Sequence, residues 1–79
     1  MKFNRTREEI IADLIEARDH RDMMVARLAE WRATYSDLMP ETIDLAHDAR
    51  SSEKVAHARE WELREYDLEN GINFSDLYN

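Results

Sequence analysis

A single apolar seam constrains the first half of this chain more than any other feature. Nine positions follow alternating four- and three-residue steps: Ile10, Leu14, Ala17, Arg21, Met24, Leu28, Trp31, Tyr35 and Leu38. Eight of these nine residues are apolar or aromatic. A repeat of 3.5 residues keeps one side of an α-helix against the same partner helix along its whole length. The pattern therefore predicts a long helix that packs against a second helix.

Local signals set the expected bounds of this first helix. Thr6-Arg7-Glu8-Glu9 fits a capping box, in which the Thr6 hydroxyl and the Glu9 carboxylate each accept a backbone N–H. No helix breaker follows until Leu38-Met39-Pro40, where the residue before proline leaves the α region. The first helix is therefore predicted to span about residues 6–38.

The second helix begins at Pro40, which suits the first helical turn, and is predicted to reach about residue 70, where Asn70-Gly71 provides a Schellman-type ending. One of its sides carries a second 3.5-spaced seam: Leu45, Ala49, Ser52, Ala56, Arg59, Leu63 and Tyr66. Other apolar residues lie on the opposite side: Ile43, Ala46, Trp61 and Leu68. Either one helix is covered on two sides, or it breaks at Ser51-Ser52; we favour continuity because no Gly or Pro interrupts it.

The composition agrees with an all-α fold. The 79 residues include one Gly and one Pro, and 37% of them are charged. We predict one helical domain over residues 1–79, an antiparallel hairpin of two long helices followed by a tail over residues 71–79. A domain of this size buries a limited core, and the absence of Cys removes disulfides as a source of stability. Self-association as a homodimeric helical bundle is therefore expected, with completion of the hairpin by a different protein as the alternative.

The net charge of −7 is concentrated in the second half, where residues 41–79 contain ten acidic and four basic side chains. Such a surface is expected to repel nucleic acid and anionic membranes and to attract a basic protein, although a merely solvated surface is the alternative. No run approaches the roughly 18 apolar residues of a membrane span. The N-terminal stretch carries acidic residues among its apolar ones, unlike a signal peptide. The protein is expected to be cytoplasmic.

The acidic end of the second helix is the strongest candidate for a binding surface. Carboxylates gather there at the negative end of the helix macrodipole, which is locally unfavourable and therefore a mark of function. The residues predicted to bind a partner are Trp61, Glu62, Glu65, Tyr66 and Glu69, together with Phe74, Leu77 and Tyr78 in the tail. The alternative for the tail is that its apolar side chains fold back over the hairpin itself.

Two arginines interrupt the seams. Arg21 lies at the centre of the first seam, and Arg59 interrupts the second at a similar height in a hairpin that turns near Pro40. A buried guanidinium needs a carboxylate, an anion or water. We predict that Arg21 and Arg59 form a polar core layer that fixes the register, with an anion-binding site as the alternative.

The sequence offers no arrangement that predicts catalysis. No nucleophile–base pair or glycine-rich phosphate loop is recognisable, and no cofactor is expected. No metal site is expected either, because Glu16 with His20 and Glu53 with His57 lack the Glu-x-x-His spacing of carboxylate-bridged metal bundles.

The leading expectation is a non-enzymatic adaptor or inhibitor that binds a basic protein. Compact acidic helical chains of this class suit phage- or mobile-element-encoded inhibitors, by analogy of class alone. A metal-dependent all-α nucleotide phosphohydrolase using Asp13, Glu16, Glu62 and Glu65 is the alternative. A structural coiled-coil subunit is a further alternative.

Overall fold

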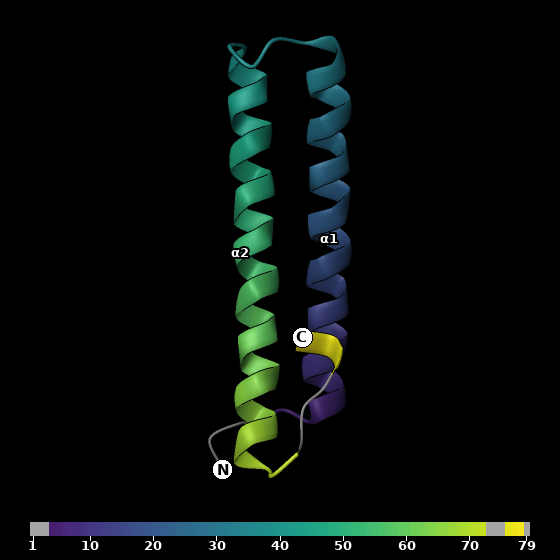
Figure 1. Ribbon diagram of the computed structural model, residues 1–79, viewed down its shortest axis with the longest axis vertical. Helices are drawn as coiled ribbons and strands as arrows, with labels where there is room; N and C mark the ends of the chain where they lie inside the picture. Colours follow the sequence, from purple (N-terminus) through teal and green to yellow (C-terminus); the bar gives the residue numbers. More distant parts are fainter. Residues whose placement is uncertain (1–3, 73–75, 79) are drawn as a thin grey trace.

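The computed structural model describes residues 4–72 and 76–78 of the chain. Two long helices, α1 (Arg7–Thr34) and α2 (Pro40–Glu69), run antiparallel and pack against each other, followed by a short 3₁₀-helix, η1 (Asp76–Tyr78) (Figure 1). The hairpin is 49 Å long. The predicted all-α helical hairpin is confirmed. Within the described ranges, no helix is long and apolar enough to cross a membrane.

The start of α1 follows its local sequence. The Thr6 hydroxyl accepts the N–H of Glu9 at 3.2 Å, and the Glu9 carboxylate accepts the N–H of Thr6 at 3.4 Å. These two bonds satisfy backbone donors that the first helical turn leaves without intrahelical partners. The predicted capping box is therefore confirmed.

The end of α1 differs from the expectation. The helix stops at Thr34, four residues before the predicted end at Leu38, and Tyr35 is already extended, with φ −120° and ψ 156°. The Thr42 hydroxyl, near the start of α2, donates to the carbonyl of Ser36 at 2.7 Å and accepts the indole N–H of Trp31 at 2.7 Å. The buried Thr42 hydroxyl therefore bonds to two residues that precede it in the chain: the Trp31 side chain in α1 and the Ser36 backbone in the turn. Because the Ser36 carbonyl bonds to this hydroxyl, α1 ends before Ser36.

The early end of α1 removes two residues from the predicted seam. Tyr35 lies outside the helix and stacks on Trp31, with ring centroids 4.1 Å apart. Leu38 is in the turn and 89% exposed. The prediction that these two residues continue the helical seam is therefore wrong.

Helix α2 is continuous, as favoured above. Ser52 is buried and its hydroxyl donates to the carbonyl of Ala49 at 2.7 Å, so the serine pair is accommodated within the helix without a break. Gly71 follows the last turn with φ 67°, and the N–H of Ile72 donates to the carbonyl of Asp67 at 2.9 Å. This is the predicted Schellman ending, which requires the left-handed conformation that glycine adopts without strain.

The core is largest at the end of the hairpin that is far from the turn. Ile10, Leu14 and Leu63 are fully buried there, and partly buried apolar residues pack around them: Ile11, Tyr66, Leu77 and Tyr78. In the middle of α2 the buried residues are small, with Ala49, Ser52 and Ala56 facing α1. The hairpin therefore buries few large side chains along most of its length.

Candidate functional site

The acidic end of α2 is tied to the N-terminal end of α1 by a buried ion pair. The Asp67 carboxylate is fully buried and receives two bonds from the Arg7 guanidinium, Nε to Oδ1 at 2.8 Å and Nη2 to Oδ2 at 3.1 Å. These bonds hold the pKa of Asp67 below its ordinary value although burial acts in the opposite direction, and the Tyr78 hydroxyl adds a further lowering hydrogen bond. The same pairing raises the pKa of Arg7.

Two more carboxylates of α2 bind arginines from elsewhere in the chain. Glu62 lies 2.6 Å from Nη1 of Arg5 and 3.2 Å from Nη1 of Arg59. Arg5 also bonds Asp13, and Glu60 is bound by Arg18 at 2.8 Å. Part of the acidic cluster that the sequence suggested for a partner thus holds the hairpin together.

The other predicted partner-binding residues of α2 occupy different environments. Glu65 and Glu69 are exposed, whereas Tyr66 is half-buried against the Ile10–Leu14–Leu63 cluster. Three further carboxylates on the same side of the helix, Glu41, Asp44 and Asp48, are exposed near its start. The structure thus presents carboxylates near both ends of one side of α2, here called the acidic stripe, with Ser51, Val55 and Ala58 between the two groups. Its contact with a partner stays a prediction.

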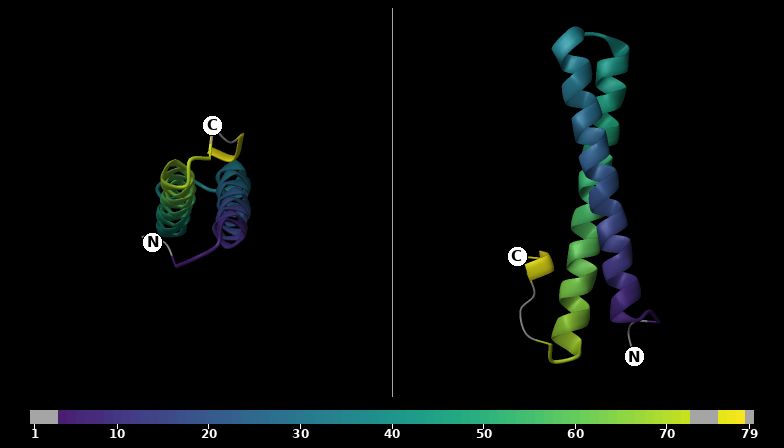
Figure 2. Two further views of the ribbon diagram at one scale, coloured as in Figure 1. Left: turned by 90° about the horizontal axis from the view of Figure 1, so that it is seen from below. Right: turned by 90° about the vertical axis from the view of Figure 1, so that its right-hand side faces the viewer.

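The end of the tail lies against the hairpin itself. Leu77 and Tyr78 pack on the terminal core, and the carbonyls of Leu77 and Tyr78 accept bonds from Arg18 and Arg64. Figure 2 shows η1 on one broad side of the hairpin, while residues 4–6 cross on the other side. Phe74, which was also assigned to a partner, lies outside the described residues.

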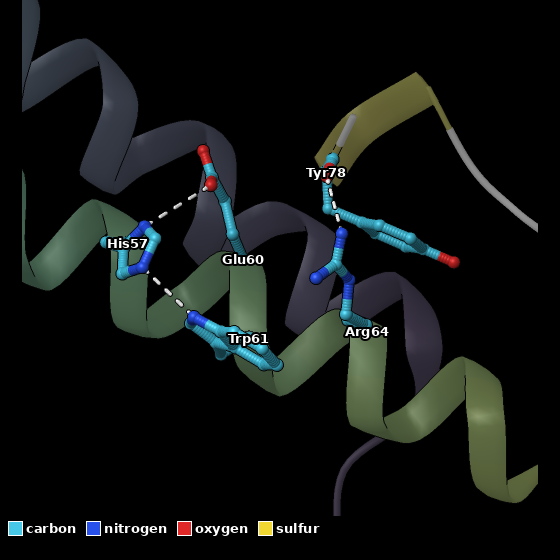
Figure 3. A pocket seen from close by; sticks show the side chains of 5 residues that line it. All are labelled: His57, Glu60, Trp61, Arg64 and Tyr78. Atoms are coloured by element: carbon cyan, nitrogen blue, oxygen red, sulfur yellow. Dashed lines mark hydrogen bonds and ion pairs between the residues drawn. The ribbon is translucent and has the colours of Figure 1, made fainter.

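A small hollow separates η1 from α2. It is lined by His57, Glu60, Trp61, Arg64 and Tyr78 and has a volume of about 100 Å³ (Figure 3). The Arg64 guanidinium lies 5.0 Å from the Trp61 ring centroid and 5.4 Å from that of Tyr78. Ligand pockets typically enclose about 300–1,000 Å³, so this hollow is too small for a nucleotide or a similar ligand.

Within the hollow, His57 links two neighbours on its own helix. Its Nε2 accepts the Trp61 indole N–H at 3.0 Å, and its Nδ1 lies 3.8 Å from the Glu60 carboxylate. The indole bond orients the side chain of Trp61, a residue that is 49% exposed. The arrangement positions an aromatic surface at the edge of α2.

The two arginines assigned to a polar core layer each bind a carboxylate of their own helix. Arg21 bonds Asp22 at 2.9 Å, and Arg59 bonds Glu62 at 3.2 Å. Their side chains are 32% and 38% exposed. The structure therefore places both guanidinium groups at the rim of the seam, and a role of the pair in register stays a prediction.

The residues considered for phosphohydrolase chemistry are only partly brought together. Asp13 and Glu62 meet through the guanidinium of Arg5, which binds both. Glu16 and Glu65 are exposed. Among the residues that the structure describes, no group of three or more His, Asp or Glu side chains is arranged to hold a metal ion.

Sequence reasoning missed the partners of the α2 carboxylates. Arg5 and Arg7 lie 57 and 60 residues away from the groups they bind. The signal that was available is the cluster of basic residues at the N-terminus, which an antiparallel hairpin brings level with the end of α2.

Comparison of the chain with protein-family models, with curated proteins and with solved structures yields no match.

Proposed function

We propose that this protein is a non-enzymatic, cytoplasmic interaction module that binds a basic protein through the acidic stripe of α2. The observation that carries the proposal is the distribution of paired and unpaired charge. Six arginines each bond a carboxylate of the chain: Arg5, Arg7, Arg18, Arg21, Arg32 and Arg59. Their positive charge is therefore neutralised by carboxylates of the chain itself.

Three carboxylates at the start of α2 are not paired in this way. Glu41, Asp44 and Asp48 are exposed, follow three- and four-residue steps along one side of α2, and bond to no other residue in the described part of the chain. Glu65 and Glu69 lie on the same side three heptads further along and are exposed, whereas Glu62 beside them is bonded by Arg5 and Arg59. A row of carboxylates on a rigid helix is suited to a basic protein surface and accelerates its encounter electrostatically.

Charge reversal at the start of the stripe tests the proposal without disturbing the fold. Asp44→Lys with Asp48→Lys is compared with Asp19→Lys with Glu30→Lys, which makes the same change in net charge on the side of α1 away from the hairpin seam. Wild type and both variants serve as baits in lysate of the native host, with circular dichroism verifying that each is folded. We expect wild type and the α1 double variant to retain a basic protein. The α2 double variant should no longer retain it.

The captured protein is then purified and titrated against the three baits. Its affinity should fall as salt is raised, because salt screens exposed charges. The proposal fails if both double variants retain the same proteins equally. Magnesium-dependent turnover of nucleoside triphosphates by the pure chain would instead favour the phosphohydrolase alternative.

A further inference from the structure

Helix α2 carries a second regular seam that does not face α1. Its eight positions follow alternating four- and three-residue steps: Ile43, His47, Arg50, Lys54, His57, Trp61, Arg64 and Leu68. Seven of them are exposed and Arg64 is half-buried. A spacing of 3.5 residues maintained over the whole helix is the pattern that keeps a partner helix in register. The residues that pack on α1 belong to the other seam of α2, which contains Ala49, Ala56 and Leu63.

Apolar side chains mark both ends of this second seam. Ile43 is 61% exposed near the start of α2, and Leu68 is 73% exposed near its end. Trp61 presents an indole that the hydrogen bond to His57 and the overlying Arg64 guanidinium hold in place (Figure 3). A fixed, half-exposed tryptophan is the kind of side chain that contributes most to binding at interfaces.

Positive charge marks the middle of the same seam. Arg50 and Lys54 are exposed and bond to no carboxylate in the described part of the chain, in a protein whose net charge is −7. They line a shallow hollow together with Glu53, His57 and Trp61. Six arginines of the chain are paired internally, whereas these two cations of the seam are groups that an external carboxylate would satisfy.

The seam also adjoins a surface that already receives a peptide segment. Tyr78 lies near Trp61 and Arg64: its ring lies over the Arg64 guanidinium, and its carbonyl accepts a bond from that group at 3.5 Å. Arg64, at this end of the seam, therefore already contacts η1 of the chain itself.

We propose that this second seam of α2, residues 43–68, pairs as a coiled coil with an acidic helix of another protein. The partner helix presents Glu or Asp opposite Arg50, Lys54 and His57 and apolar residues opposite the two ends. A second copy of the chain is disfavoured as occupant, because it offers neither cation a carboxylate: with the ends of the seam matched in antiparallel register, Arg50 faces Trp61 and Lys54 faces His57. The proposal is independent of the acidic stripe, which lies on a different side of α2.

Two synthetic peptides test this inference on the full chain. Each is a helix of about four heptads with Leu at the seam positions of its first and last heptads. One carries Glu at the central seam positions and the other carries Lys. Fluorescence anisotropy of the labelled peptides measures binding. We expect the Glu peptide to bind roughly tenfold or more tightly than the Lys peptide, because the central seam residues decide which helices pair.

The variant Arg50→Glu is matched by Arg27→Glu, since Arg27 is also exposed but lies on α1, outside the seam. We expect Arg50→Glu to weaken the Glu peptide about tenfold and Arg27→Glu to leave it unchanged. The double variant Arg50→Glu with Lys54→Glu should instead gain affinity for the Lys peptide. Circular dichroism verifies that every variant is helical.

The inference is overturned if neither peptide binds, if both bind equally, or if Arg50→Glu behaves like Arg27→Glu. Self-association of the wild-type chain that Arg50→Glu abolishes, measured by analytical ultracentrifugation, also overturns it, because the seam then belongs to a second copy. If no basic protein binds the acidic stripe, this inference is unaffected. The acidic stripe and the seam of residues 43–68 lie on different sides of α2 and carry opposite charges.

Discussion

Asp67 shows how one buried charge can organise the end of a helix. Its position next to other carboxylates near the C-terminus of α2 is unfavourable in isolation, because the macrodipole there is already negative. The bidentate Arg7 guanidinium and the Tyr78 hydroxyl reverse that balance by satisfying the buried carboxylate. The residue therefore ties α2 both to the start of α1 and to the docked tail.

Asp67→Asn tests this role. The amide keeps the size of the side chain but removes the charge that Arg7 binds, so we expect a loss of roughly 1–3 kcal/mol in the free energy of unfolding. Urea titration followed by circular dichroism measures it. Asp37→Asn is the matched control, because the Arg32–Asp37 pair at 3.0 Å is exposed and contributes little. Equal effects of the two substitutions would contradict the assigned role.

The lowered pKa of Asp67 also predicts how stability depends on pH. Because the folded-state pKa lies below that of the unfolded chain, the unfolded state binds more protons between the two values, and stability rises with pH there. The contribution of Asp67 is complete above about pH 4, the ordinary aspartate value, and is lost as pH falls through the folded-state pKa. Urea titrations at several acidic pH values should show a shallower decline for Asp67→Asn than for wild type.

Elements whose limits depend on neighbouring residues were predictable, and those set by distant contacts were not. The capping box at Thr6, the start at Pro40 and the ending at Gly71 follow from short sequence signals, and all three appear in the structure. The end of α1 at Thr34 depends on hydrogen bonds of the Thr42 hydroxyl to Trp31 and Ser36. These contacts cross the turn, so the residues next to Thr34 in the sequence do not predict them.

We therefore expect the Thr42 hydroxyl to stabilise the turn between α1 and α2. Thr42→Val keeps the shape of the buried side chain but leaves the Trp31 indole N–H and the Ser36 carbonyl without their shared partner. We expect a loss of roughly 1–3 kcal/mol in the free energy of unfolding, accompanied by a change in the near-ultraviolet circular dichroism of tryptophan. Thr42→Ser retains the hydroxyl and should preserve most of the stability and the spectrum. A Val variant as stable as the Ser variant would refute this explanation of the turn.

At the scale of the molecule, the sequence indicated the sign of the charge but not its arrangement. Counting residues placed an acidic surface on the second helix, yet Glu60, Glu62 and Asp67 are neutralised by arginines that only the fold brings near. What remains is a hairpin whose second helix has an acidic stripe and, on another side, a basic seam with apolar ends. Periodicity located the seam of α2 that faces α1 and apolar residues on its opposite side, whereas the pairing of the α2 carboxylates with arginines required three-dimensional contacts.

The homodimer expected from the sequence stays a prediction. The chain exposes 5735 Å², whereas a compact monomer of 9.4 kDa exposes about 5,000 Å². The difference of about 700 Å² follows from the elongated shape of the hairpin, whose extents are 49 × 21 × 15 Å. On α1, Ile15 and Met23 are large apolar residues that are each 48% exposed, so a second copy is expected to cover them.

Light scattering coupled to size exclusion should then give a mass near twice 9.4 kDa at micromolar concentration. Replacing both Ile15 and Met23 by Ser removes apolar area from the expected interface and should shift the protein toward monomer, because apolar burial drives association. Arg50→Glu should leave the mass unchanged, since it lies on the seam assigned to a different partner. A wild-type mass of one chain would show that α1 needs no second copy, and the hairpin would then depend on its terminal core and its internal ion pairs.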